Sequence, residues 1–258
     1  MSDDAIAPAT KGGFLTELRL AASFLTIIPV IDHQRASEDT VAASFAWFPV
    51  VGCFIGVALA AEDWLLSYVC AQVIRSVLII ISLTVVTGAV HLDGLADTAD
   101  ALGAGLDRDR ALEILRDSRV GTFGASAIFF DLTLKILALS TLAGTRRYAG
   151  LLFAPMLARW AMVTVASGLP YLRASGSGST LLDGKKFGNV AGIISVFTLV
   201  IFWTLGAMRP IALATAVALP IVFAMRLFYR RWLGGVTGDL IGACGEVIEI
   251  AVLLTMSL

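Results

Sequence analysis

The sequence predicts an all-α fold, a polytopic bundle of transmembrane helices. Of its 258 residues, 58% are hydrophobic and only 15% are charged, whereas soluble domains have about 45–50% apolar and about 25% charged residues. The mean hydropathy is +0.87. The apolar residues also gather in runs close to the roughly 20 residues that cross a bilayer. Backbone groups in lipid must be hydrogen-bonded within their own segment, so these runs are expected to be helices.

This composition excludes a disordered chain, a nucleic-acid binder and an ordinary cytosolic enzyme. About seven spans would use about 140 residues, which leaves loops but no room for a second folded domain. We therefore expect residues 1–258 to form a single integral membrane domain, with a flexible N-terminus at 1–13. The cysteines have no paired spacing, so we interpret Cys53, Cys70 and Cys244 as small buried apolar residues.

The predicted elements begin with residues 14–31, where Glu17 and Arg19 interrupt the first half of an apolar segment. We interpret this segment as an interfacial or re-entrant helix, with a true span as the alternative. Longer apolar runs follow and are the predicted spans. They are residues 42–61, 76–92, 120–143, 148–170, 189–207, 211–229 and 240–258.

The distribution of Lys and Arg predicts the orientation of these spans. With the N-terminus in the cytoplasm, most of the loop cations fall on the cytoplasmic side. Only Arg75, Arg146, Arg147 and Arg209 fall on the other side. Positive charge in short loops favours the cytoplasm, so we expect the N-terminus inside and the C-terminus outside.

The first informative cluster is the segment HLDGLADTAD, which contains Asp93, Asp97 and Asp100. Their spacing of four and then three residues places all three on one helix face. Three carboxylates on one stripe repel one another unless a cation lies among them, and their oxygens suit Mg²⁺ or Mn²⁺. The alternative is an acidic helix end stabilised by the helix dipole. His91 and Gly94 adjoin the stripe, and His91 could equally be a hydrogen-bonded structural residue.

The second cluster, RDSRVGTFG at residues 116–124, opens the next apolar run. Glycines and a hydroxyl at a helix start expose backbone N–H groups that can bind an anion, and two arginines can hold phosphate oxygens in forked hydrogen bonds. The alternative is a cytoplasmic flank with a helix cap. The candidate phosphate-binding residues are Arg116, Asp117, Ser118, Arg119, Gly121 and Thr122.

The third cluster, GGVTGD at residues 234–239, again precedes an apolar run. Asp239, Glu246 and Glu249 share one helix face by spacing, and ionisable residues at membrane depth are costly unless they face a polar cavity. They could supply further metal ligands or contacts to a polar substrate. The candidate residues are Gly235, Thr237, Gly238, Asp239, Glu246 and Glu249.

Two further features lie inside the spans. Asp131 and Lys135 are four residues apart and are expected to pair with each other, while Arg159 is expected to reach an acid or a phosphate across the bundle. In the orientation chosen above, all three clusters lie at the cytoplasmic face. Carboxylates for a metal, together with arginines and glycine loops for phosphate, predict metal-assisted phosphoryl transfer.

These clusters also carry a resemblance to a known family. The blocks are HLDGLADTADAL, LRDSRVGTFG and LGGVTGDLIGACGEVIE, supported by FLTIIPV, FPVVGCFIG and APMLARWAM. In this order they resemble the cobalamin synthases, the adenosylcobinamide-GDP ribazoletransferases, over about residues 14–258. The chain departs from the family pattern at Ile27, where an arginine is usual, at Ala101, where a glycine is usual, and over residues 171–188.

The resemblance implies a transferase of the bacterial inner membrane that joins adenosylcobinamide-GDP to α-ribazole, or to its 5′-phosphate, and releases GMP. It also implies Mg²⁺ as cofactor. We expect Asp93 and Asp97 to bind the ion and Asp100 to be a further ligand or the general base. Arg116 and Arg119 would then neutralise charge on the phosphates.

In the same scheme, Asp239 and Glu246 would complete the metal shell or orient the ribazole. We expect no nucleic-acid partner. The candidate protein partners are further copies of the chain, in a homo-oligomer, and other enzymes of the corrinoid pathway.

Two other functions fit the acidic stripe. A CDP-alcohol phosphotransferase of lipid synthesis also places aspartates at helical spacing, but its DxxDGxxAR pattern differs from the sequence here, in which LAD follows the DG pair. A cation transporter would place its site near the bilayer midplane, often in repeated halves, and the sequence has no repeat.

Overall fold

The computed structural model describes residues 13–29, 36–117, 119–172 and 208–258. The described part is helical and contains no named strand, which confirms the all-α fold. Its elements are α1 (Phe14–Leu25), α2 (Glu38–Ser44), a short 3₁₀ turn η2 (Phe45–Trp47), α3 (Phe48–Leu66), α4 (Gln72–Val86), α5 (Val90–Gly103), α6 (Arg108–Ile114), α7 (Thr122–Thr141), α8 (Gly144–Ala166), α10 (Met208–Trp232) and α11 (Gly238–Ser257).

Five helices in the described ranges are long and apolar enough to cross a membrane: Asp39–Leu66, Thr122–Thr141, Gly144–Ala166, Arg209–Trp232 and Gly238–Ser257. Each coincides with a predicted span, so the chain is a multi-pass membrane protein. The predicted span 189–207 lies outside the described residues. The number of seven spans is therefore not confirmed.

The predicted span 76–92 is a bent pair instead of one straight helix. α4 and α5 meet at an angle of 89°, and the break contains Gly88 and Ala89 with φ of 62° and 56°. These left-handed conformations cannot continue a right-handed helix. Since α5 carries three aspartates, the bend also turns an acidic helix away from the direction of α4.

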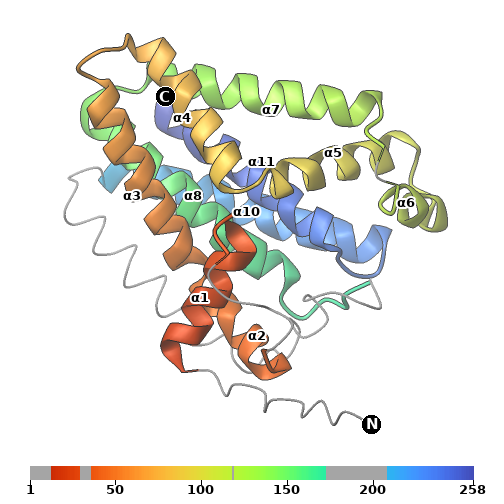
Figure 1. The fold of residues 1–258 in the computed structure, drawn as a ribbon. Coiled ribbons are helices and arrows are strands. Elements are labelled where there is room, and N and C mark those ends of the chain that lie inside the picture. The colour runs from red at the N-terminus through yellow and green to blue at the C-terminus, as the bar shows by residue number, and fades with distance from the viewer. Residues whose placement is uncertain (1–12, 30–35, 118, 173–207) are drawn as a thin grey trace, which may run out of the picture.

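Helix α1 has 12 residues, too few to span a bilayer. It packs against α2 and α3 at the lower part of the molecule in Figure 1. Trp47 Nε1 donates to Glu17 at 3.1 Å, and the Phe14 ring lies edge-on to Trp47 with centroids 4.7 Å apart. The contact with Trp47 explains how Glu17 is accommodated in an apolar segment.

Helix α8 forms the centre of the bundle and is packed by α3 and α11. Gly52 and Gly56 of α3 meet the α8 backbone directly: a Cβ on Gly52 would lie 2.5 Å from the Pro155 carbonyl oxygen, and one on Gly56 2.7 Å from that of Leu151. Small residues allow such close approach of helices in membranes. By contrast, α7 lies along the outer edge of the bundle in Figure 1 and exposes large apolar side chains such as Phe129 and Phe130.

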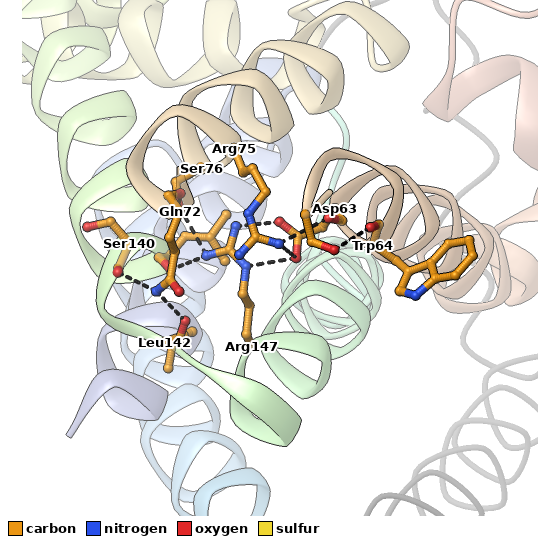
Figure 2. Close-up of polar contacts among 10 residues, drawn as sticks. Asp63, Trp64, Gln72, Arg75, Ser76, Ser140, Leu142 and Arg147 are labelled. Carbon is orange, nitrogen blue, oxygen red and sulfur yellow. Dashed lines mark hydrogen bonds and ion pairs between the residues drawn. The ribbon is translucent and has the colours of Figure 1, made fainter. Parts of the chain in front are cut away.

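A buried ion cluster joins α3, α4, α7 and α8 near one end of these helices (Figure 2). Asp63 is fully buried, and its carboxylate accepts hydrogen bonds from Arg147 Nε at 2.9 Å and from Arg147 Nη2 at 2.5 Å. Arg75 adds a contact to the same carboxylate at 3.3 Å, and Arg147 also donates to the Leu139 carbonyl at 2.6 Å. We expected Arg147 to lie in a loop outside the spans. That was wrong: it lies inside α8, and its charge is compensated by Asp63.

Candidate active site

The backbones of α5 and the start of α11 are in contact. A Cβ on Gly94 would lie 2.7 Å from the carbonyl oxygen of Asp239, and one on Gly242 would lie 3.1 Å from the Cα of His91, which is buried. A side chain at Gly94 would force the two helices apart. This contact places Asp239 beside the turn of α5 that begins at Asp93, so the first and third clusters lie together.

Helix α5 is also fastened to the start of α7. Asp100 accepts hydrogen bonds from the backbone N–H of Gly121 at 2.7 Å and of Gly124 at 2.9 Å. A Cβ on Gly121 would lie 2.5 Å from the Asp100 carboxylate. The predicted anion site at Gly121 and Thr122 therefore receives a carboxylate from the chain itself, and the glycines serve this contact.

Asp93 and Asp97 lie one turn apart on α5, Asp93 exposed and Asp97 half-buried. Among the described residues no group of three or more His, Cys, Asp or Glu side chains could hold a metal ion. The structure therefore does not bring Asp93, Asp97, Asp100 and Glu246 together as one ligand set. Two carboxylates still fit Mg²⁺, because this ion is usually held by one or two carboxylates together with substrate phosphates.

The segment that contains Arg116 and Arg119, called the arginine segment below, lies between α6 and α7. It is at the same end of the molecule as the end of α5 (Figure 1). Arg119 holds Asp117 in a forked contact, with Nε 3.0 Å from Oδ1 and Nη2 2.6 Å from Oδ2. The side-chain hydrogen bonds from Arg119 lower the pKa of the half-buried Asp117 carboxyl. Arg116 is exposed, and Ser118 lies outside the described residues. Both guanidinium groups can reach a ligand from solvent.

The glycine segment before α11 is tied to the residues that follow α8. Val236 N donates to the Pro170 carbonyl at 2.9 Å, and a Cβ on Gly235 would collide with the same oxygen. Thr237 is buried and caps α11 by accepting from Leu240 N. These contacts give Gly235 and Thr237 structural roles. Gly238, the next residue, is exposed at the start of α11.

A second group of charges is buried inside the bundle. Lys135 lies 3.1 Å from Asp131 and 2.9 Å from Glu249, and it also donates to Glu246. Arg159 pairs with Glu249. These contacts confirm the predicted Asp131–Lys135 pair and the predicted reach of Arg159 to an acid across the bundle.

This buried network leaves no room for a substrate. The adjoining cavity has a volume of about 10 Å³, enough for about one water molecule. Buried ions need partners at close range, and Lys135 is the counter-charge that Glu246 and Glu249 require. Spacing along the chain predicts only Asp131 as a partner of Lys135. Two acids at membrane depth on α11 were the available signal that a cation from another helix would be needed.

Comparison with known proteins decides the family. The family described as Cobalamin-5-phosphate synthase matches residues 17–257. The chain belongs to this family.

Relatives of the cobalamin-5-phosphate synthase family match the chain along nearly its whole length. The adenosylcobinamide-GDP ribazoletransferase of Geotalea daltonii is 38% identical over 92% of this chain and 95% of its own. The proteins of the same name from Syntrophobacter fumaroxidans and a Roseiflexus species are 37% and 36% identical, and cover 90% and 98% of this chain and 94% and 93% of their own. No solved structure matches the chain. The protein is thus a transferase of cobalamin synthesis.

Two departures from the pattern of the cobalamin synthases can be located in the structure. Ile27 is exposed, and its backbone N–H donates to the Val86 carbonyl at 2.8 Å, so the residue helps to fasten the end of α1 to the end of α4. Ala101 is fully buried on α5. Residues 173–188 of the poorly matching loop lie outside the described residues.

Proposed function

We propose that this chain joins adenosylcobinamide-GDP to α-ribazole, or to α-ribazole 5′-phosphate, in a Mg²⁺-dependent reaction that releases GMP. The product is adenosylcobalamin or its 5′-phosphate. The observation that carries this proposal is that the aspartate-bearing face of α5, the acid stripe, meets two other segments. Asp100 joins it to the start of α7, beside the arginine segment, through its contact with Gly121. Gly94 joins it to the start of α11 through its close approach to Asp239. The names of the relatives supply the substrates.

In the proposed reaction a ribazole hydroxyl oxygen attacks the phosphorus on the cobinamide side of the diphosphate. A new P–O bond forms, the bond to the GMP oxygen breaks, and GMP leaves with the electron pair. A bound Mg²⁺ would supply positive charge that stabilises the negative charge developing on the diphosphate oxygens. Asp93 and Asp97 would hold the ion, because their carboxylates lie on one face of α5 at a spacing of one turn.

The other residues have distinct roles in this proposal. Arg116 and Arg119 are exposed beside the stripe and neutralise phosphate charge. Asp100 positions the arginine segment through its two hydrogen bonds to the start of α7. The proton of the attacking hydroxyl passes to a carboxylate of the stripe. Asp239 lies against α5 and orients the second substrate.

The buried network has a separate role. Glu246, Glu249 and Arg159 are ion-paired inside the bundle, and the cavity beside them is too small for a ribazole. We infer that they hold α7, α8 and α11 in register behind the site. His91 packs against Gly242 of α11 and belongs to the same supporting layer.

We also propose that the protein resides in the bacterial inner membrane with this site facing the cytoplasm. The distribution of Lys and Arg supports this orientation, and nucleotide-linked substrates are available on that side. Homo-oligomers and contacts with other enzymes of the corrinoid pathway remain part of the proposal.

The test is GMP release by the purified full-length protein in detergent or proteoliposomes. We expect release to require adenosylcobinamide-GDP, ribazole and Mg²⁺ together, and to stop when EDTA is added and resume with excess Mg²⁺. Turnover of CDP-diacylglycerol with an alcohol in place of these substrates would contradict the proposal. Cation flux in proteoliposomes without any nucleotide would also contradict it.

A further inference from the structure

A surface cavity lies between α6 and the segment that leads into α7. Its volume is about 270 Å³, and it is lined by Arg110, Glu113, Ile114, Arg116, Asp117 and Arg119. The cavity thus combines three guanidinium groups, two carboxylates and one half-buried aliphatic side chain. The proposed phosphate contacts use Arg116 and Arg119. They leave the α6 side of the cavity, with Arg110 and Glu113, without a role.

The two carboxylates of this cavity are held differently. Asp117 is engaged by Arg119 through hydrogen bonds to both of its oxygens, at 2.6 to 3.1 Å. Glu113 receives one hydrogen bond, at 2.7 Å, from Arg110 Nη1 to its Oε2, and its side chain is 70% exposed. Glu113 is therefore the carboxylate that can face a ligand while Arg110 fixes its orientation.

We propose that Glu113 recognises the guanine base of the GDP-bearing substrate, and that the cavity binds the GMP portion that becomes the leaving group. This inference rests on the proposed function. Guanine presents two adjacent N–H donors on one edge, and an ionised carboxylate offers two acceptor oxygens in a matching geometry. Adenine presents an unprotonated ring nitrogen at the corresponding position, so a carboxylate there rejects it. Ile114 gives the base an apolar surface.

The order of groups along the site matches the order of groups in the substrate. Asp93 and Asp100 are separated by about 10 Å along the axis of α5. Asp100 bonds to Gly121, Arg119 lies two residues before that glycine, and the cavity with Glu113 follows. A diphosphate held at Asp93 and Asp97 would direct its guanosine end past the arginines towards α6. This path ends at the molecular surface, where GMP can leave.

The experiment compares adenosylcobinamide-GDP with its ADP analogue as substrates of the full-length protein, and GMP with AMP as ligands in titration calorimetry. We expect the wild-type protein to prefer the guanine compounds in both measurements. Glu113→Gln replaces one acceptor oxygen by a donor. It should lower kcat/KM for the GDP substrate and the affinity for GMP at least about tenfold, and leave the values for the adenine compounds unchanged.

Asp109→Asn is the matched control, because Asp109 lies on the same helix, is 92% exposed and does not line the cavity. Asp109→Asn should leave unchanged both the ratio of kcat/KM for the GDP and ADP substrates and the ratio of the affinities for GMP and AMP. An unchanged guanine-to-adenine ratio in Glu113→Gln would overturn the inference, as would equal wild-type affinity for GMP and AMP. A loss of discrimination in Asp117→Asn, with Glu113→Gln unaffected, would move the guanine contact to Asp117 and so also overturn it.

The two proposals fail in different ways. If the wild-type protein turns over neither substrate, the proposed function is wrong. In that case, calorimetry that shows GMP preferred over AMP, with the preference lost in Glu113→Gln, would still support the guanine site. If GMP release proceeds but the two measured ratios do not respond to Glu113, the function stands and the guanine assignment falls.

Discussion

Asp97 is the residue on which the proposed metal site depends most directly. It lies half-buried on α5, one turn from the exposed Asp93. Asp97→Asn keeps the size of the side chain but removes the charge that attracts the ion. We expect turnover to fall by about 10²-fold or more, since electrostatic groups in an active site contribute on this scale, while the melting temperature in detergent changes little.

The control for Asp97→Asn is Asp109→Asn, which removes an exposed carboxylate on α6 and should retain wild-type turnover. Raised Mg²⁺ should partly rescue Asp97→Asn if Asp97 is a ligand. Wild-type turnover and normal Mg²⁺ dependence in Asp97→Asn would mean that the metal is held elsewhere.

Gly124 tests the link between the acid stripe and the arginine segment. A Cβ at this position would collide with the Asp100 carboxylate and would lie 2.9 Å from the Ala96 carbonyl oxygen. Gly124→Ala should therefore push α7 away from α5, destabilise the protein by roughly 1–3 kcal/mol and lower turnover. Unfolding in detergent and GMP release would be measured on the same preparation.

Gly13→Ala provides the comparison for this substitution. A Cβ on Gly13 has no neighbour within 4 Å, so both measurements should match the wild type. If Gly124→Ala were as stable and as active as Gly13→Ala, the contact of Asp100 with the start of α7 would not position the site.

At the scale of helices, charged contacts inside the bundle join α7 and α8 to α11. Lys135 of α7 is 97% buried and faces three carboxylates. Lys135→Met would leave Asp131 and Glu246 without their counter-charge, while Glu249 would keep only its ion pair with Arg159. We expect a loss of about 3–5 kcal/mol of stability, the usual cost of removing one partner of a buried ion pair, measured by unfolding in detergent.

A second substitution separates the charge effect from the loss of packing. Adding Glu246→Gln to Lys135→Met removes one of the uncompensated charges, so the double variant should be more stable than Lys135→Met alone. If the double variant were less stable than the single variant, the penalty would come from packing of the lysine stem instead of from unpaired charge.

At the scale of the whole molecule, the site lies where α5, α6 and the start of α7 meet, at one end of the molecule in Figure 1. The cluster of Asp63, Arg75 and Arg147 lies near the end of α3 and the start of α8 (Figure 2). The positive-inside rule predicts that α6 lies in the cytoplasm and the turn after α3 on the other side of the membrane. Single-cysteine variants Asp109→Cys and Ser67→Cys, both exposed in the structure, test this orientation once the native cysteines are replaced by serine.

In intact spheroplasts a membrane-impermeant maleimide should label the cysteine at position 67 and not the one at position 109. In inverted vesicles the pattern should reverse. The opposite result in both preparations would place the proposed site outside the cytoplasm, where the nucleotide substrate is absent.

The sequence by itself determined the membrane class, because a high apolar fraction and runs of about span length follow from composition and spacing alone. It also located the acid stripe and the arginine and glycine segments, since helical spacing and scarce charges stand out in an apolar chain. The Asp131–Lys135 pair was predictable for the same reason, as both residues lie on one helix.

Only the tertiary structure decided which charges meet across helices. Asp100 and Glu246 have the same carboxylate chemistry as Asp93, but one binds the start of α7 and the other binds Lys135. The bend between α4 and α5 and the burial of Arg147 against Asp63 depend likewise on neighbours far apart in sequence. Spacing along the chain fixes which residues share a helix face. What that face binds depends on how the helices pack.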